Sequence, residues 1–301
     1  MQGIEQDIQL NVALRYLTIF DRQANLQVTE DQYNKLLKTY KDAETRFKVG
    51  LIQKNDLLKV KVDLDFAEIV LKRVQANLAK SIELLAREVD SPVQLDQLGF
   101  TEFEQLPILP AEDSLLADML KSRSEIRVLQ ELVHAADAQA KAEYARYAPS
   151  VDFIGSYHKY DDDFINDLGN GYDEEVRGQV VLSINIFDGF EKSAQVSKAK
   201  LTVQAIRYDL EELENDLRTE LHNLLLDFQV SAANTVAAET GIKQAEENLR
   251  VTRLSYQEGL ATGTDLLDAI SSLSRANFTY VAAKQEVFAN YFNITRAVEG
   301  F

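Results

Sequence analysis

One short stretch of the sequence occurs twice, and this repetition limits what the chain can fold into. Both copies, residues 46–58 and 256–267, carry a Gly-Leu pair followed by an Asp-Leu-Leu triplet. The shared residues are Gly50, Leu51, Asp56, Leu57 and Leu58 in the first copy and Gly259, Leu260, Asp265, Leu266 and Leu267 in the second. Each copy follows a polar helical stretch, turns at glycine, and offers Asn55 or Thr264 as the N-cap of the next helix. The sequence therefore predicts one helix–turn–helix hairpin that is made twice.

Leucines recur every seven residues after the first turn, at positions 57, 64, 71, 78 and 85. The same register after the second turn holds apolar or aromatic side chains, at Leu266, Leu273, Tyr280, Val287 and Ile294. A strict seven-residue spacing forms a seam that packs against another helix in left-handed coiled-coil geometry. Only 12 Gly and 4 Pro interrupt the 301 residues, so the helices are expected to be long. The predicted fold class is therefore mainly α, with long antiparallel coiled-coil helices.

The hydrophobic period changes from helical to two in the middle of the chain. Apolar side chains alternate with polar ones over residues 151–157 and 176–186, which predicts two strands of roughly ten residues, about the length that crosses a bilayer when tilted. An acidic segment from Asp161 to Glu175 joins them. Its spacing does not fit an EF-hand calcium loop, so a solvated loop is the favoured interpretation. One hairpin alone is marginal and must find more strands.

Helix-breaking residues divide the chain into three segments. They are a first helical hairpin over residues 1–90, a connector over 91–110 and a second repeat over 111–301. The second repeat is expected to hold a helix over 111–148, the β-hairpin over 150–187 and a long helical hairpin over 190–299. Its longest helix would extend about 100 Å and must lie beside other helices.

The charge and the missing residue types exclude several classes of function. The formal net charge is −17, whereas nucleic acid or an anionic lipid surface needs a basic footprint. The sequence has no Cys, so thiolate metal sites do not occur. His134, His158 and His222 lack metal-ligand spacing, and no nucleophile with a base, phosphate loop or paired-acid motif stands out. We therefore expect no enzyme, no cofactor and no metal site.

Four segments in a characteristic order cover nearly the whole chain. They are the helix start Arg123-Ser124-Glu125-Ile126, the helix end Tyr147-Ala148-Pro149-Ser150, the strand 180–186 leading into Phe187-Asp188-Gly189, and the two Gly-Leu turns. In this order the segments resemble the TolC-like outer-membrane efflux proteins. The resemblance implies the outer-membrane factor of a tripartite efflux or type I secretion system.

The resemblance further implies a homotrimer in the cell outer membrane, with its helices in the periplasm. Each subunit would give strands to a trimeric transmembrane β-barrel in the lipid of the outer membrane, and long helices to a periplasmic α-barrel. The subunit would be a passive exit duct for small molecules or secreted proteins, and an inner-membrane pump would supply the energy. A periplasmic adaptor protein would dock on the Gly-Leu tips, and nucleic acid would have no part.

The chain departs from that family in one respect. It has one strand hairpin, although the helical repeat occurs twice. The second repeat has a leading section over residues 111 to 211 without a counterpart in the first, so we expect about 100 residues (211 − 111) to be missing upstream. The strands of three such chains would then be too few to close the expected barrel.

The docking candidates are Gly50, Leu51, Gly259 and Leu260. Glycine permits the positive φ of a tight turn, and an exposed leucine at a tip suits a partner's surface. The alternative is that these residues only form the turn.

The candidate periplasmic gate consists of Asp265, Asp268, Tyr256 and Asp56. Asp265 and Asp268 share one helix face. The resemblance places them at the closed entrance, where the carboxylates of a trimer would raise one another's pKa and attract cations. Tyr256 and Asp56 match positions that the family links by a hydrogen bond, whereas a basic residue of that gate is replaced by Ala261. The alternatives are a helix N-terminal role for Asp265, a solvated Asp268 and a core role for Tyr256.

A soluble periplasmic coiled-coil adaptor or scaffold is the alternative from a different class. It would explain the heptads equally well. It would not explain two strands of bilayer length set between helices, and an adaptor would also show a Gly-rich β domain beside its hairpin. The channel is therefore the favoured interpretation.

Overall fold

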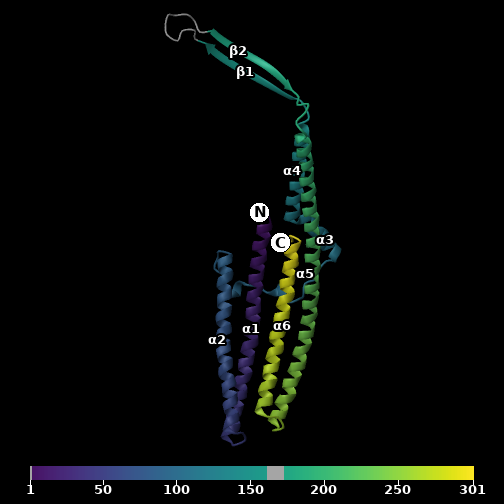
Figure 1. Ribbon diagram of the computed structural model, residues 1–301. Coiled ribbons are helices and arrows are strands. Elements are labelled where there is room, and N and C mark those ends of the chain that lie inside the picture. The colour runs from purple at the N-terminus through teal and green to yellow at the C-terminus, as the bar shows by residue number, and fades with distance from the viewer. Residues whose placement is uncertain (1, 161–172) are drawn as a thin grey trace, which may run out of the picture. The chain divides into compact units, whose positions relative to one another are not determined.

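The structure is a computed structural model in which residues 2–160 and 173–301 are described (Figure 1). Its elements are α1 (Gln2–Lys48), α2 (Lys54–Glu88), η1 (Leu95–Gln97), η2 (Thr101–Phe103), α3 (Glu112–Ser122), α4 (Ser124–Ala145), β1 (Ser150–Tyr160), β2 (Asp173–Ser183), α5 (Glu191–Gln257) and α6 (Gly263–Ala297). They group into two units, Met1–Ser124 with Asp216–Phe301 and Glu125–Asn215, and α5 contributes to both. The predicted mainly α fold with a small β part is confirmed.

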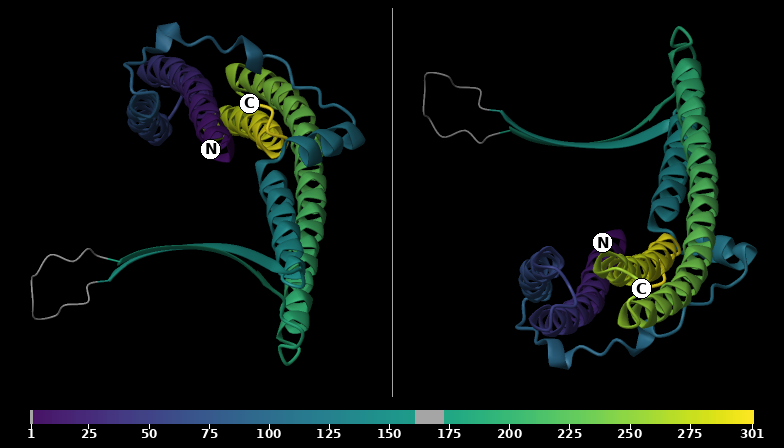
Figure 2. Two further views of the ribbon diagram at one scale, coloured as in Figure 1. Left: turned by 90° about the horizontal axis from the view of Figure 1, so that it is seen from above. Right: turned by 90° about the horizontal axis from the view of Figure 1, so that it is seen from below.

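Four helices of the first unit stand in a curved row, in the order α2, α1, α6 and α5 (Figure 2). The leucine seam of α2 faces α1, and its members Leu64, Leu78 and Leu85 are buried because the heptad spacing keeps them on one side. Apolar residues occupy two sides of α6. Both sides are buried, because α6 has a neighbouring helix on each side. The two hairpins, α1–α2 and α5–α6, therefore form one layer.

A hydrophobic cluster near the two turns joins all four helices. Its buried members are Leu36, Ala43, Val60, Leu64, Ala67, Leu249, Tyr256, Leu266, Leu267, Ala269, Ile270 and Leu273. Farther along, Asn290 Nδ2 of α6 donates to Ser231 Oγ of α5 at 3.1 Å. The cluster gives the turns a defined position relative to one another, which is what a site built from both turns needs.

The connector between α2 and α3 lies along one side of the row (Figure 2). Phe103 on this connector is 1% exposed, and its ring centroid lies 4.8 Å from Phe20 of α1 and 4.8 Å from Phe288 of α6. Burial and a hydrogen bond with Glu102 of the connector raise the pKa of Tyr16, on α1, to about 12. The connector therefore binds the two hairpins together at a second level.

The segment 111–148 was expected to be one helix, and this expectation was wrong. Arg123, with φ −58° and ψ 119°, leaves the helical region and separates α3 from α4. The buried guanidinium of Arg123 donates from Nη1 to the carbonyl oxygen of Ala297, on α6, at 3.0 Å. The break is thus fixed by a contact between distant segments, which a helical period cannot reveal.

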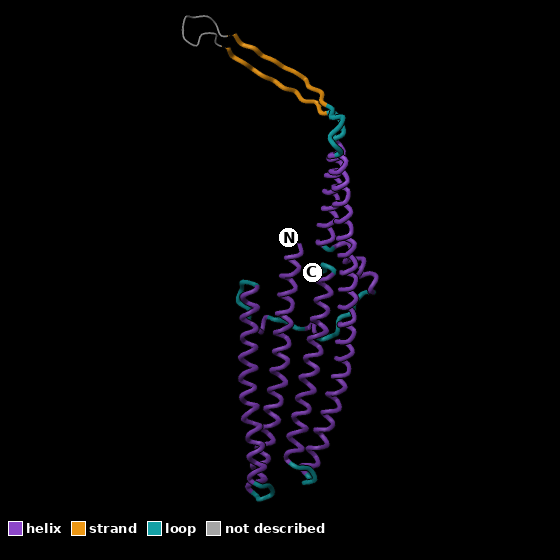
Figure 3. Tube along the Cα trace, viewed as in Figure 1, coloured by secondary structure: helices purple, strands orange, loops and turns teal. Residues whose placement is uncertain are grey.

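The second unit contains the antiparallel hairpin of β1 and β2 (Figure 3). Its register pairs Val151 with Leu182 and Phe153 with Val180. Because side chains alternate along a strand, these residues share one face, and all four are exposed. β2 ends at Ser183 and not at residue 186 as predicted, since the next partner would be Pro149, which has no backbone N–H. Residues 161–172 of the predicted acidic loop lie outside the described residues, and its last part, residues 173–175, belongs to β2.

Candidate functional site at the helical tips

The two Gly-Leu turns have the same backbone geometry and lie at the same end of the first unit (Figure 3). In the first turn, Leu51 N donates to Arg46 O at 2.9 Å and Gly50 N donates to Phe47 O at 3.0 Å. In the second, Leu260 N donates to Ser255 O at 2.8 Å and Gly259 N donates to Tyr256 O at 3.2 Å. Both glycines have positive φ, 78° and 76°. This is the Schellman pattern, which satisfies the last carbonyls of a helix and requires glycine for its left-handed residue.

Each turn exposes the leucine that follows its glycine. Leu51 is 70% exposed and Leu260 is 83% exposed. The turn needs only the glycine and the backbone of the next residue, so neither leucine side chain is required for the turn itself. Two large apolar side chains therefore stand free at equivalent places.

The helices that follow the two turns begin differently, and both predicted N-caps were wrong. The N-cap of α2 is Gln53 and not Asn55, and it makes no side-chain capping bond. The N-cap of α6 is Thr262 and not Thr264. Thr262 Oγ1 accepts from Asp265 N at 3.2 Å, and Asp265 Oδ2 accepts from Thr262 N at 2.7 Å. This reciprocal capping box anchors only the second copy.

The capping box gives Asp265 a structural role within one chain. Its carboxylate accepts hydrogen bonds from the hydroxyl and the backbone N–H of Thr262, and both bonds lower the pKa of Asp265. The predicted mutual rise in pKa concerned the carboxylates of an assembled trimer, so it stays a prediction.

Asp268 is exposed one turn farther along α6 and faces an acidic residue that was not predicted. Burial raises the pKa of Asp63, on α2, and the negative charge of Asp268 raises it further. The acidic character of the tips therefore involves both hairpins. Asp63 directly precedes Leu64, a residue of the leucine seam. Its position beside the heptad core could have identified it, from the sequence, as a carboxylate near the contact between helices.

Tyr256 is buried in the hydrophobic cluster, and the guanidinium of Arg46 lies over its ring. The Arg46 guanidinium carbon lies 4.7 Å from the centre of the Tyr256 ring. Burial raises the pKa of Tyr256, the positive charge of Arg46 opposes this shift, and the charges of Asp42 and Asp56 add to it. Among the described residues no hydrogen bond joins Tyr256 to Asp56, the pair that the sequence suggested.

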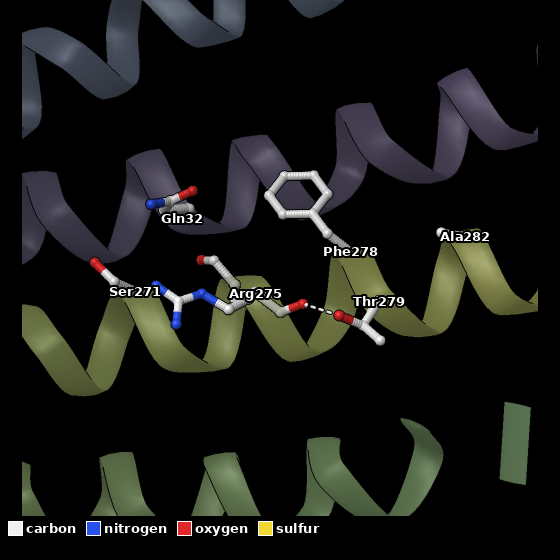
Figure 4. Close-up of a pocket in the computed structure, with 7 residues that line it drawn as sticks. Gln32, Ser271, Arg275, Phe278, Thr279 and Ala282 are labelled. Atoms are coloured by element: carbon white, nitrogen blue, oxygen red, sulfur yellow. Dashed lines mark hydrogen bonds between the residues drawn. The ribbon is translucent and has the colours of Figure 1, made fainter. Parts of the chain in front are cut away.

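A shallow hollow of about 460 Å³ lies between α1 and α6 (Figure 4). Gln32 of α1 and Arg275, Phe278 and Thr279 of α6 line it. Thr279 Oγ1 donates to the Arg275 carbonyl oxygen at 3.0 Å, a bond within the helix. Arg275 is the charged side chain among the residues that line the hollow.

No group of three or more His, Asp or Glu side chains in residues 2–160 and 173–301 could hold a metal ion. No helix in these ranges has a stretch both long and apolar enough to cross a membrane.

The sequence profile of the outer membrane efflux proteins matches residues 115–298 of this chain, more than half of its length. The chain belongs to the outer membrane efflux protein family. Among curated relatives, it is 21% identical over 288 residues to the alkaline protease secretion protein AprF of Pseudomonas aeruginosa. It is 22% identical over 310 residues to the outer membrane protein TolC of Escherichia coli. These alignments cover 92% and 99% of this chain, but only 60% and 62% of the relatives.

Solved structures show the same fold. CusC, a protein that forms a transmembrane channel, superposes with a TM-score of 0.82 at 19% identity, over all of this chain and 70% of that chain. VceC of Vibrio cholerae superposes with a TM-score of 0.75 at 21% identity, over 98% of this chain and 70% of that chain. The resemblance inferred from the sequence is confirmed, and family membership assigns the protein to the outer membrane of a Gram-negative bacterium.

Proposed function

We propose that the chain is part of a channel subunit that forms a passive exit duct through the outer membrane and docks on a periplasmic adaptor protein through its two Gly-Leu tips. The observation that carries this proposal is the pair of identical turns at one end of the first unit, each with a free leucine. An inner-membrane pump would supply the energy and select small molecules or a secreted protein. The subunit itself catalyses no reaction.

A homotrimer is the assembly that we propose. The face of α2 that points away from its seam carries exposed apolar side chains at three- and four-residue spacing, namely Leu58, Val62, Phe66 and Ile69. A stripe of this kind on a helix is typical of a surface that packs against another helix. A neighbouring copy of the chain would cover it and continue the row of helices into an α-barrel.

The β-hairpin is proposed to enter the lipid of the outer membrane as part of a trimeric β-barrel. Each strand has 11 residues, and a tilted membrane strand needs about 9 to 11. Its exposed apolar face, with Phe153 78% exposed, would be costly in water and is suited to lipid.

The division into repeats 1–90 and 111–301, with the connector 91–110 between them, stays a prediction.

The gate is proposed to lie just inside the tips. Asp268 is exposed and close enough to Asp63 to raise its pKa, so negative charge from both hairpins gathers there. In a trimer these carboxylates, with Asp265, would surround one entrance and attract cations.

The soluble adaptor is not favoured, because the relatives and solved neighbours are outer-membrane proteins.

The docking proposal is tested by replacing Leu51 and Leu260 with Asp and measuring export in cells at normal expression. Loss of export is expected, since a charge would replace the apolar contact without disturbing the turn. Ile108→Asp is the matched control, because Ile108 is 94% exposed but lies on the connector. Unchanged export with both tip variants would contradict the docking role.

A further inference from the structure

The C-terminal end of α6 and the N-terminal end of α4 exchange hydrogen bonds. Arg123, directly before α4, donates from Nη1 to the carbonyl oxygen of Ala297, the last residue of α6, at 3.0 Å. In return, Oε1 of Glu299, just beyond α6, accepts from the backbone N–H of Ser124, the first residue of α4, at 2.8 Å. Each helix end therefore receives a charged partner from the other segment.

Both charges have the sign that the helix end favours. The last carbonyls of a helix form the negative end of its dipole, and the Arg123 guanidinium lies there. The first N–H groups form the positive end, and the Glu299 carboxylate lies there. Hydrogen bonds with a charged partner are stronger than bonds between neutral groups. The two segments thus form a reciprocal cap.

Glu299 occupies a backbone position that favours glycine. Its φ is 51°, in the left-handed region. Gly300 N donates to Thr295 O at 2.8 Å, and Glu299 N donates to Arg296 O at 3.0 Å. This is the Schellman pattern of the two tips, where the same position holds glycine. A side chain is strained there, so the turn itself does not explain a glutamate.

The segment that carries Glu299 is also fixed by α1. Phe301 N donates to Gln6 Oε1 at 3.2 Å, and Gln6 Nε2 donates to Phe301 O at 3.1 Å. Arg296 Nε donates to Asp7 Oδ1 at 2.6 Å. These bonds lie on both sides of Glu299 in the sequence, so its carboxylate is held close to the place where α4 begins.

We propose that Glu299 is a positioning residue: its carboxylate fixes the first turn of α4, and this cap outweighs the strain of its own turn. The start of α4 then depends on the docked end of α6. Because α4 leads into β1, the helix that precedes the β-hairpin is fixed by residues near the end of the helical layer. Both sides of the cap lie in the first unit, and this role does not depend on whether the protein conducts.

Replacement by glycine separates the strain from the cap. Glu299→Gly relieves the strained φ but removes the carboxylate. The unfolding temperature of the full chain in detergent, followed by circular dichroism, should therefore fall. The amides at the start of α4 should exchange with solvent about fivefold faster, measured by hydrogen–deuterium exchange.

Asp90→Gly is the matched control. Asp90 also has a positive φ, 50°, at the end of α2, and its side chain makes no hydrogen bond or ion pair among the described residues. Only strain is removed in this variant, so its unfolding temperature should rise by a few degrees.

A double-mutant cycle identifies the partner of the carboxylate. Ser124→Pro removes the N–H that Glu299 accepts from, and proline suits the first residue of a helix and the ψ of 119° at Arg123 before it. In that background Glu299→Gly should raise the unfolding temperature, as Asp90→Gly does, because only the relief of strain remains.

Glu299→Gln keeps an acceptor without the charge, so its amide exchange at the start of α4 should lie between that of Glu299→Gly and that of the unchanged chain. Two results would overturn the proposal. One is a higher unfolding temperature with unchanged amide exchange in Glu299→Gly alone. The other is a loss from Glu299→Gly that is as large in the Ser124→Pro background as in the unchanged chain.

Discussion

The two tips have the same turn but different surroundings. Gly50 and Gly259 have nearly equal φ, and the hydrogen bonds around them match. Beyond the turn the copies diverge, because α2 begins without a side-chain cap and buries one face, whereas α6 begins with a capping box and buries two. The repeated motif thus determines the shape of each tip, and the neighbouring helices determine how firmly it is held.

The largest difference in unfolding free energy is expected between substitutions at corresponding positions of α2 and α6, the helices that follow the two turns. Ile270 is fully buried on α6, and the corresponding residue of the first copy is the exposed Lys61. Ile270→Ala should lower the free energy of unfolding by about 2 to 5 kcal/mol, through lost burial and a residual cavity. Lys61→Ala should change it little, and denaturant unfolding followed by circular dichroism compares the two. Equal losses of unfolding free energy in the two variants would contradict the difference in packing between α6 and α2.

A smaller difference is expected at the helix starts. Thr262→Ala removes the capping box of α6 and should cost about 1 kcal/mol in unfolding free energy. Gln53→Ala should cost much less, because Gln53 makes no side-chain capping bond. If Gln53→Ala lowered the unfolding free energy as much as Thr262→Ala, the proposed difference between the two helix starts would be contradicted.

The smallest effect is expected at the acidic residues between the hairpins. The folded state raises the pKa of Asp63, so its charged form is disfavoured there and stability decreases as pH rises through that raised pKa. Asp63→Asn should therefore be more stable than the unchanged protein at pH 7, measured as a higher unfolding temperature. The gain should shrink as pH falls toward the ordinary range of an aspartate. Asp65→Asn is the control, since Asp65 pairs with Lys61 at 2.7 Å and its removal should bring no gain.

The predictable parts of the fold were those set by local sequence. Gly50 and Gly259 were recognised because a left-handed turn residue needs glycine, and Leu64 and Leu85 because a heptad keeps one side buried. Thr262 was missed as a cap because its partner three residues later is Asp and not the more familiar Glu or Gln.

The missed parts depend on contacts between distant segments. Arg46 meets Tyr256 and Gln257 more than 200 residues later, at a separation of 210 or 211 residues. The interruption at Arg123 likewise depends on Ala297 at the far end of the chain. Spacing along one element carries no signal for either contact. The Arg46 contact depends on the packing of the two hairpins into one layer, and the Arg123 contact depends on the junction of α3 and α4 lying against the end of α6.

The most direct test of the proposed exit duct is the single-channel conductance of the full-length subunit in a planar lipid bilayer. We expect discrete conductance steps that become larger, and less sensitive to block by multivalent cations, when Asp265 and Asp268 are both replaced with Ala. Thr262→Ala, which removes the cap but keeps both charges, should leave the cation block unchanged. Absence of conductance steps, or steps whose size and cation block do not depend on the two aspartates, would contradict an acidic entrance at the tips.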